Sequence, residues 1–84
     1  MPFRTEHAAR QLPPERFVRF ARKQLAPGVS VILGIDENGT SHVQSLRFDK
    51  VRYSPAEARA WLQRHGFRAE LEEAQDDGGA WEWT

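Results

Sequence analysis

The sequence contains no cysteine, and this absence excludes several kinds of protein at once. Without thiols the chain has no disulfide framework, no cysteine-based zinc site and no thiolate nucleophile. No apolar run is long enough for a signal peptide or for a membrane-spanning helix. The sequence therefore predicts a soluble protein in the cytoplasm that does not enter a membrane.

Motifs for catalysis and for metal or phosphate binding are equally scarce. The glycines are isolated or follow acidic residues, so none of them opens a phosphate-binding loop before a helix. His7, His42 and His65 stand in none of the spacings that are typical of metal sites. His42 and Ser45 lie three positions apart on one predicted strand, hence on opposite faces, and cannot exchange a proton. We therefore predict a protein that is not an enzyme and holds no metal and no cofactor.

The chain has no net charge, but its charges are unevenly distributed. Residues 1–24 carry six basic and two acidic side chains, for a net charge of +4. Residues 70–84 carry six acidic side chains and no basic one, for a net charge of −6. This asymmetry indicates either an anionic partner or complementarity within the molecule.

The clearest predicted element is a helix whose two ends are both marked, within residues 54–67. Ser54 is a suitable N-cap, Pro55 suits the first helical position, and Glu57 completes a capping box. Gly66 suits the left-handed position that follows a helix. The residues on the predicted apolar stripe are Ala58, Trp61, Leu62 and His65. Because a helix of about ten residues is unstable alone, we expect this stripe to pack on a sheet.

A β-hairpin is predicted over residues 29–48. Residues 29–35 are rich in β-branched side chains, and residues 36–39 contain the Asn-Gly pair that is typical of a tight turn. A two-residue turn would pair Leu33 with Gln44. One face of the hairpin would then carry Val29, Val31, Leu33, Leu46 and Phe48, which we predict to form the core.

A first helix is predicted over residues 15–25, where apolar side chains recur at helical spacing. The Pro27-Gly28 pair ends this pattern. The side chains expected to face inward are Phe17, Phe20, Ala21 and Leu25. The segment before this helix, residues 3–12, is compatible with either a short strand or a frayed helix.

Residues 67–74 alternate well enough for a third strand, and residues 80–83 for a short fourth strand. The predicted fold is therefore α+β, with a small antiparallel sheet of three to four strands packed on one face by two helices, in the order α-β-β-α-β(-β). We expect residues 1–84 to form a single domain. Residues 1–6 are expected to fray, and residues 75–79 to form an acidic turn that contains glycine.

Several short stretches resemble a known family. They are His7-Ala8-Ala9-Arg10, Gly28-Val29, Gln44-Ser45-Leu46-Arg47-Phe48-Asp49-Lys50, Pro55-Ala56-Glu57-Ala58, Trp61-Leu62 and His65-Gly66-Phe67. Together they resemble a small phage and prophage domain that occurs alone or beside prohead maturation proteases of the XkdF type. The resemblance implies a viral, phage-encoded interaction module that contributes to head assembly or maturation through protein–protein contacts with a phage or host partner. It also implies a location in the cytoplasm of the bacterial host or on the virion.

Two other functions are compatible with the charge pattern. The first is nucleic-acid binding through the basic N-terminal helix, with Arg16, Arg19, Arg22 and Lys23 as phosphate contacts. The second is a small phage inhibitor of a host defence complex, of the anti-CRISPR kind, whose acidic tail mimics phosphate charge. The candidate residues for a partner interface are Trp81, Trp83, Glu72, Asp76 and Asp77. The two tryptophans either fold back onto the sheet or anchor a partner, and the oligomeric state is left open.

Overall fold

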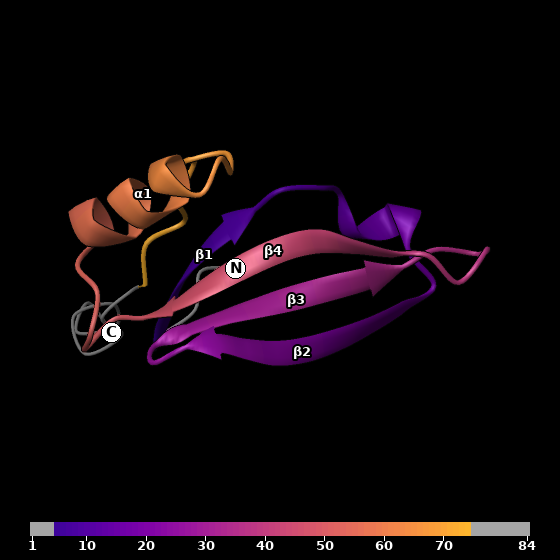
Figure 1. Cartoon of the computed structure of the whole chain (residues 1–84), viewed down its shortest axis with the longest axis horizontal. Helices are drawn as coiled ribbons and strands as arrows, with labels where there is room; N and C mark the ends of the chain where they lie inside the picture. The colour runs from indigo at the N-terminus through magenta and orange to yellow at the C-terminus, as the bar shows by residue number, and fades with distance from the viewer. Residues whose placement is uncertain (1–4, 75–84) are drawn as a thin grey trace, which may run out of the picture.

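The computed structural model of the chain describes residues 5–74 and consists of one antiparallel sheet and one α-helix (Figure 1). The elements in chain order are β1 (Glu6–Arg10), a single 3-10 turn η1 (Pro14–Arg16), β2 (Arg19–Ala26), β3 (Val29–Ile35), β4 (Ser41–Asp49) and α1 (Pro55–Arg64). The sheet order is β1-β4-β3-β2. In Figure 1 α1 lies at one end of the sheet beside β1 and β4, and β2 forms the opposite margin. The predicted α+β class and an antiparallel sheet of four strands are confirmed. The predicted element order α-β-β-α-β(-β) is wrong, because all four strands precede α1, and the second covering helix is not found among the described residues.

The helix predicted over residues 15–25 is wrong, because most of this segment forms the edge strand β2. Ala26 pairs with Val29, and Gly28 between them has a φ of +79°. A positive φ at the second central position, with Pro27 at the first, is typical of a type II turn. The Pro-Gly pair therefore closes a hairpin between β2 and β3 and does not mark the end of a helix. The ambiguous segment before it contains β1.

The turn between β3 and β4 is one residue longer than predicted. The Asp36 amide donates to the Thr40 carbonyl over 3.0 Å, and the Gly39 amide donates to the Asp36 carbonyl over 3.0 Å. Gly39 has a φ of +83°, which a type I turn followed by a left-handed residue requires. This three-residue loop pairs Leu33 with Val43, so the predicted pairing of Leu33 is wrong.

A β-bulge in β4 compensates for the longer turn. The register shifts between Ile32 and Leu33, where β4 contributes the extra residue Gln44. Beyond the bulge, Val31 pairs with Leu46 as predicted. Without the extra residue, the apolar side chains of β4 would lie on the opposite face from those of β3. The bulge therefore keeps the predicted core on one face of the sheet.

The core lies between this face of the sheet and α1. Phe48, Leu46, Val29 and Leu62 are completely buried. Trp61 of α1 lies 5.5 Å from Phe48 between ring centroids, in an edge-on arrangement at 73°. The predicted core residues Val29, Val31, Leu46 and Phe48 are therefore confirmed, and Leu33 is partly buried at their margin.

The predicted ends of the second helix are also confirmed. The Ser54 hydroxyl accepts a hydrogen bond from the Glu57 amide over 3.1 Å, and the Glu57 carboxylate accepts one from the Ser54 amide over 2.8 Å. Gly66 has a φ of +77°, and the Phe67 amide donates to the Leu62 carbonyl over 2.9 Å. These bonds satisfy backbone groups that a helix leaves without partners at its two ends.

The segment after α1 returns along the outer margin of β1. Ala8 and Glu72 exchange backbone hydrogen bonds of 2.9 and 2.7 Å, and the Gln11 side chain makes two further bonds to the backbone of Arg68. The strand predicted over residues 67–74 is thus reduced to one isolated bridge, since a side chain takes the place of the second backbone pair. The fourth strand predicted over residues 80–83 lies outside the described residues.

Candidate partner-binding surface

The face of the sheet away from α1, termed the open face, carries charged and small side chains. Its small side chains are Ala8, Ser30 and Ser45, and its charged ones are Glu6, Arg10, Arg22 and Arg47. Because successive side chains of a strand alternate between faces, these residues lie opposite the core. The small side chains leave room above the sheet for the long arginines.

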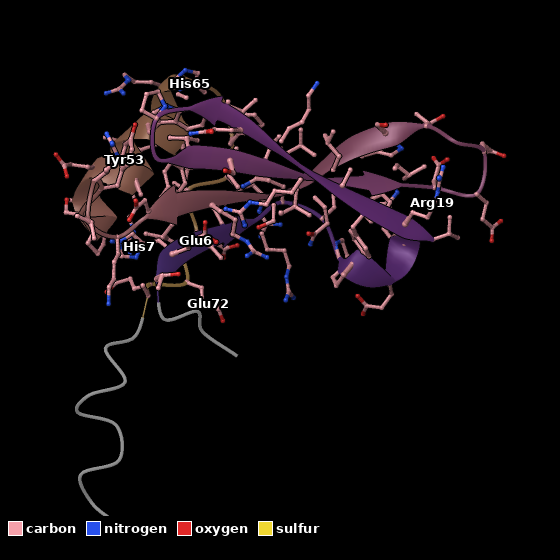
Figure 2. All side chains as sticks on the ribbon, turned by 90° about the horizontal axis from the view of Figure 1, so that it is seen from below. Glu6, His7, Arg19, Tyr53, His65 and Glu72 are labelled. Carbon is pink, nitrogen blue, oxygen red and sulfur yellow. The ribbon has the colours of Figure 1, made fainter. Side chains whose placement is uncertain are left out.

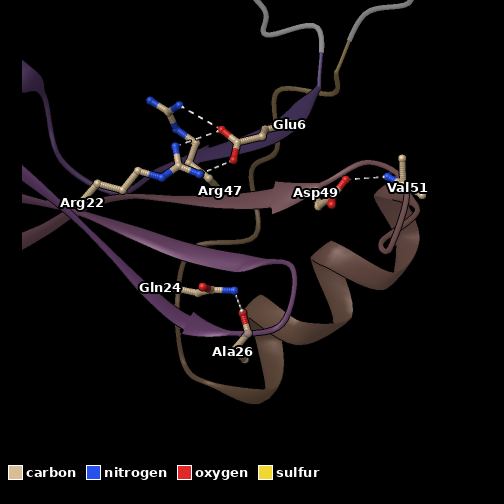
Figure 3. Close-up of polar contacts among 7 residues, drawn as sticks. All are labelled: Glu6, Arg22, Gln24, Ala26, Arg47, Asp49 and Val51. Atoms are coloured by element: carbon tan, nitrogen blue, oxygen red, sulfur yellow. Dashed lines mark hydrogen bonds and ion pairs between the residues drawn. The ribbon is translucent and has the colours of Figure 1, made fainter.

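Glu6 joins three strands across this face (Figure 3). Arg22 of β2 donates to both of its carboxylate oxygens, from Nη1 over 3.2 Å and from Nη2. Arg47 Nη1 of β4 lies 3.6 Å from Glu6 Oε1. The hydrogen bond from Arg22 lowers the pKa of Glu6 below its ordinary value, and the same bond raises the pKa of Arg22. β1, β4 and β2 are therefore tied together by one carboxylate.

The two margins of the sheet differ. The outer margin of β1 is covered by residues 68–72, through the backbone pair of Ala8 with Glu72. Among the described residues no strand lies beyond β2, and its side chains are exposed from Arg19 to Leu25. Of the two margins, that of β2 is the one open to another chain.

The backbone groups along the open margin of β2 can be assigned from the register. The Asp49 amide donates to the Gly28 carbonyl over 2.9 Å, so Gly28 and every second residue after it direct their backbone groups toward β4. The residues between them direct theirs toward β2, where they pair with Arg19, Ala21 and Lys23. Because backbone direction alternates along a strand, the remaining groups point outward. They are the N–H and C=O groups of Phe20, Arg22 and Gln24.

Apolar side chains accompany this margin. Val18, Phe20 and Leu25 are 59%, 50% and 52% exposed. The Phe20 ring meets the ring of Phe17 edge-on, with 6.1 Å between their centroids. Phe17 itself lies over Gly34, where a Cβ would collide with its ring. Phe20 is therefore a half-exposed aromatic side chain on a packed support, which is typical of an interface anchor.

The four cations predicted to contact nucleic acid do not lie on one helix. Arg16 is in η1, and Arg19 and Lys23 project from β2 on the side of the sheet that carries α1. Arg22 projects from the open face and is paired with Glu6. The basic N-terminal helix is therefore wrong, and the structure brings only Arg19 and Lys23 together on one face of β2. Figure 2 shows Arg19 at the far end of the sheet from Glu6 and Glu72.

The other candidates for a partner interface fall mostly outside the described residues. Trp81, Trp83, Asp76 and Asp77 all do so, as does the question of whether the tryptophans fold back. Glu72 is described: its backbone covers β1 and its side chain is exposed.

The three histidines are used in separate structural contacts. His7 is buried: its Nε2 lies 3.0 Å from the Tyr53 carbonyl, and its Nδ1 accepts a hydrogen bond from the Ala74 amide over 2.8 Å. His42 pairs with Asp36 at 3.0 Å. His65 stacks on Trp61 at 3.8 Å between ring centroids. Within residues 5–74 no group of three or more potential ligands is placed to hold a metal ion.

A groove of about 680 Å³ opens on the open face beside β1. Its lining includes the small side chains of Ala8 and Ser45 together with Arg10, Arg47, Glu70 and Glu72. Charges of both signs therefore line it, and they do not favour one class of ligand. The sequence pattern did not indicate this groove, nor the margin of β2, because both depend on how the strands are ordered in the sheet.

No helix in the described part of the chain is both long and apolar enough to cross a membrane.

The prediction that the protein is not an enzyme stays a prediction.

Comparison with protein families matches residues 19–69 to the family described as "BRX: Transcription factor regulating root and shoot growth via Pin3". The matched segment begins with β2, includes β3, β4 and α1, and continues past the end of α1 to residue 69, so it covers more than half of the chain. Neither the curated proteins nor the solved structures include a match to the chain.

This match overturns the resemblance to a phage domain. Residues 44–50 and 55–67, which carried most of that resemblance, lie inside the matched segment. The family's description concerns transcription and the growth of roots and shoots, and it contains nothing of phage, virion or head assembly. The phage head-assembly module, the phage inhibitor and the viral origin are therefore wrong.

Proposed function

Since the chain belongs to the BRX family, we propose that it is a protein-interaction module whose β2 margin binds an extended segment of a partner protein. The family is described by transcriptional regulation, and a binding module of this kind would serve to recruit a regulatory partner. The matched segment begins at Arg19, the first residue of β2, so the proposed binding strand lies within the part that defines the membership.

The observation that carries this proposal is the difference between the two margins of the sheet. A free edge strand is a template for another strand, and proteins normally protect such an edge by covering it, shortening it, bending it with a β-bulge or placing charged side chains along it. β2 carries three cations and a bulge after Gln24, which disfavour unselective pairing but leave its outward backbone groups uncovered. Here residues 68–72 cover β1, whereas β2 is exposed along its length. Addition of a strand to such an edge is a common mode of peptide recognition.

The chemistry of the margin is suited to this mode. The outward N–H and C=O groups of Phe20, Arg22 and Gln24 supply backbone hydrogen bonds, which contribute affinity without selecting a sequence. Selectivity then comes from side chains that alternate between the two faces. Phe20 is the anchor, because a half-exposed aromatic ring on a rigid support loses little freedom on binding.

Proline at Gln24 provides a direct test. The amide of Gln24 points outward, so proline there removes a donor to the partner without removing a hydrogen bond between β2 and β3. A library of random peptides is first selected for binding to the wild-type chain. Gln24→Pro is expected to keep the wild-type melting temperature within a few degrees and to lose binding of the selected peptides by at least about tenfold.

The matched control is Gln63→Ala, on the exposed side of α1, which should leave peptide binding unchanged. Selected peptides that bind Gln24→Pro as tightly as the wild-type chain would contradict the assignment of the site to the β2 margin.

A further inference from the structure

We propose that the segment bound by β2 is acidic, with one carboxylate opposite Arg19, a second opposite Lys23, and an apolar residue opposite Phe20. This inference rests on the proposed function, since it concerns the partner of the same margin.

The first support is the charge of the margin. The sequence contains no acidic residue between Glu15 and Asp36, a segment that includes the whole of β2. Among the described residues, neither Arg19 nor Lys23 has an ion-pair partner, and both side chains are exposed. Asp36 itself is bonded to His42. Both cations are thus available to a partner strand.

The second support is the direction of the side chains. Arg19 pairs with Ile35 and Lys23 with Val31, so both cations project on the same side of the sheet, four residues apart. On the opposite side, Arg22 is already held by Glu6, and Phe20 remains as the exposed anchor. An antiparallel partner would therefore present the order acid, any residue, any residue, apolar, acid.

The third support is that a second copy of this chain fits the margin poorly. Pairing β2 with another β2 would bring together two strands that each carry three cations and no acid. Like charges opposite one another across two strands are destabilising, whereas opposite charges stabilise the pair. The margin therefore favours an acidic segment of a different protein.

The test uses a capped peptide that contains Glu-Thr-Val-Ile-Glu and an otherwise identical peptide with both Glu replaced by Gln. Fluorescence anisotropy with the full chain is expected to show binding of the Glu peptide that is about five- to tenfold tighter than that of the Gln peptide. This difference should shrink as salt is raised, because exposed charges are screened.

A charge exchange provides the sharpest arm. The double variant Arg19→Glu/Lys23→Glu should reverse the preference, binding a peptide with Lys at both positions better than the Glu peptide. Misfolding cannot make the double variant bind the Lys peptide better than the Glu peptide. That result would therefore establish that residues 19 and 23 contact the two charged positions of the peptide. Loss of all peptide binding by a variant that melts like the wild type would contradict the pairing.

The failures of the two proposals can be told apart. Equal binding of the Glu and Gln peptides, with both lost in Gln24→Pro, would overturn the acidic preference and leave the binding margin in place. Undiminished binding of the Glu peptide to Gln24→Pro would overturn the margin itself. Sedimentation should show a monomer, and a dimer that Gln24→Pro dissociates would assign the margin to a second copy. Peptide binding that appears only after Asp76 and Asp77 are replaced by Asn would show that the β2 margin binds the chain's own acidic segment.

Discussion

At the scale of single residues, Trp61 connects α1 to the sheet through its contact with Phe48. Its ring packs edge-on against Phe48, stacks on His65 and lies parallel to Phe67 with 6.1 Å between centroids. It is 9% exposed. Aromatic side chains bury more apolar surface than any others, and a sheet with a single covering helix has few alternatives to it.

We expect Trp61→Ala to lower the free energy of unfolding by about 3–5 kcal/mol, because it leaves a cavity between α1 and the sheet. A loss of that size is comparable to the whole stability of many small domains, so the variant should be largely unfolded at room temperature. Urea denaturation followed by circular dichroism measures this. Val51→Ala, at a side chain that is 85% exposed, is the control and should change stability by less than about 0.5 kcal/mol. A denaturation midpoint of Trp61→Ala near that of the control would show that α1 does not depend on this contact.

At the scale of secondary-structure elements, α1 and β2 show opposite relations between sequence and structure. The signals for α1 are local hydrogen bonds at its two ends, which hold wherever the helix is placed. The signals for β2 are weak, because Arg, Ala, Lys and Gln favour helices over strands. β2 is a strand because its backbone pairs with β3 along its length, and because the Pro-Gly turn places the two segments side by side.

Ser54→Ala should therefore destabilise the protein by about 1 kcal/mol, through the loss of the N-cap hydrogen bond to the Glu57 amide. Ser54→Asp keeps an acceptor at the same place and should recover most of that loss. The measurement is the free energy of unfolding of the three proteins under the same conditions. Equal stability of Ser54→Ala and the wild type would mean that the capping box contributes nothing to holding α1 on the sheet.

At the scale of the whole molecule, Glu6 is the residue that unites strands distant in the sequence. Its carboxylate receives Arg22 from one margin of the sheet and lies near Arg47 in the middle. The pKa of Glu6 is lowered chiefly by the Arg22 hydrogen bond, with burial opposing it. A carboxyl whose pKa is lower in the folded state binds protons more readily when unfolded, so it stabilises the fold only while it is ionised.

The contribution of Glu6 should thus be complete above the ordinary carboxyl pKa of 4.5 that it has in the unfolded chain, and should be lost as the pH falls through the lower pKa of the folded state. We expect Glu6→Gln to be less stable than the wild type near neutral pH and to show a shallower loss of stability on acidification. Urea denaturation between about pH 6 and pH 3 measures both curves. The pKa values of Asp36 and Glu57 are also lowered, by His42 and by the Ser54 amide, but these groups are present in both proteins. Parallel curves for the two proteins would show that Glu6 does not act as this link.

Sequence patterns predicted the elements whose causes are local. The capping box, the left-handed Gly66, the position of the turn at Asn38-Gly39 and the strands on either side of it each depend on residues within a few positions of one another, whereas the length of that turn was not predicted. The core residues Val29, Val31, Leu46 and Phe48 were predictable for the same reason. Alternation along a hairpin assigns faces without reference to the rest of the chain, provided that turn and bulge together preserve the register.

The binding margin was decided only by the tertiary structure. Residues 15–25 have a helical spacing of apolar side chains, and nothing within that segment shows that it will lie beside β3. Nor does the sequence show that residues 68–72 will cover β1 and leave β2 open, because this depends on hydrogen bonds between residues more than fifty positions apart, such as Gln11 with Arg68. Local patterns determine which segments are able to form strands and helices. The order in which the strands pair is decided by hydrogen bonds between distant segments and by the packing of α1 on one face of the sheet. This order also decides which edge remains free to bind.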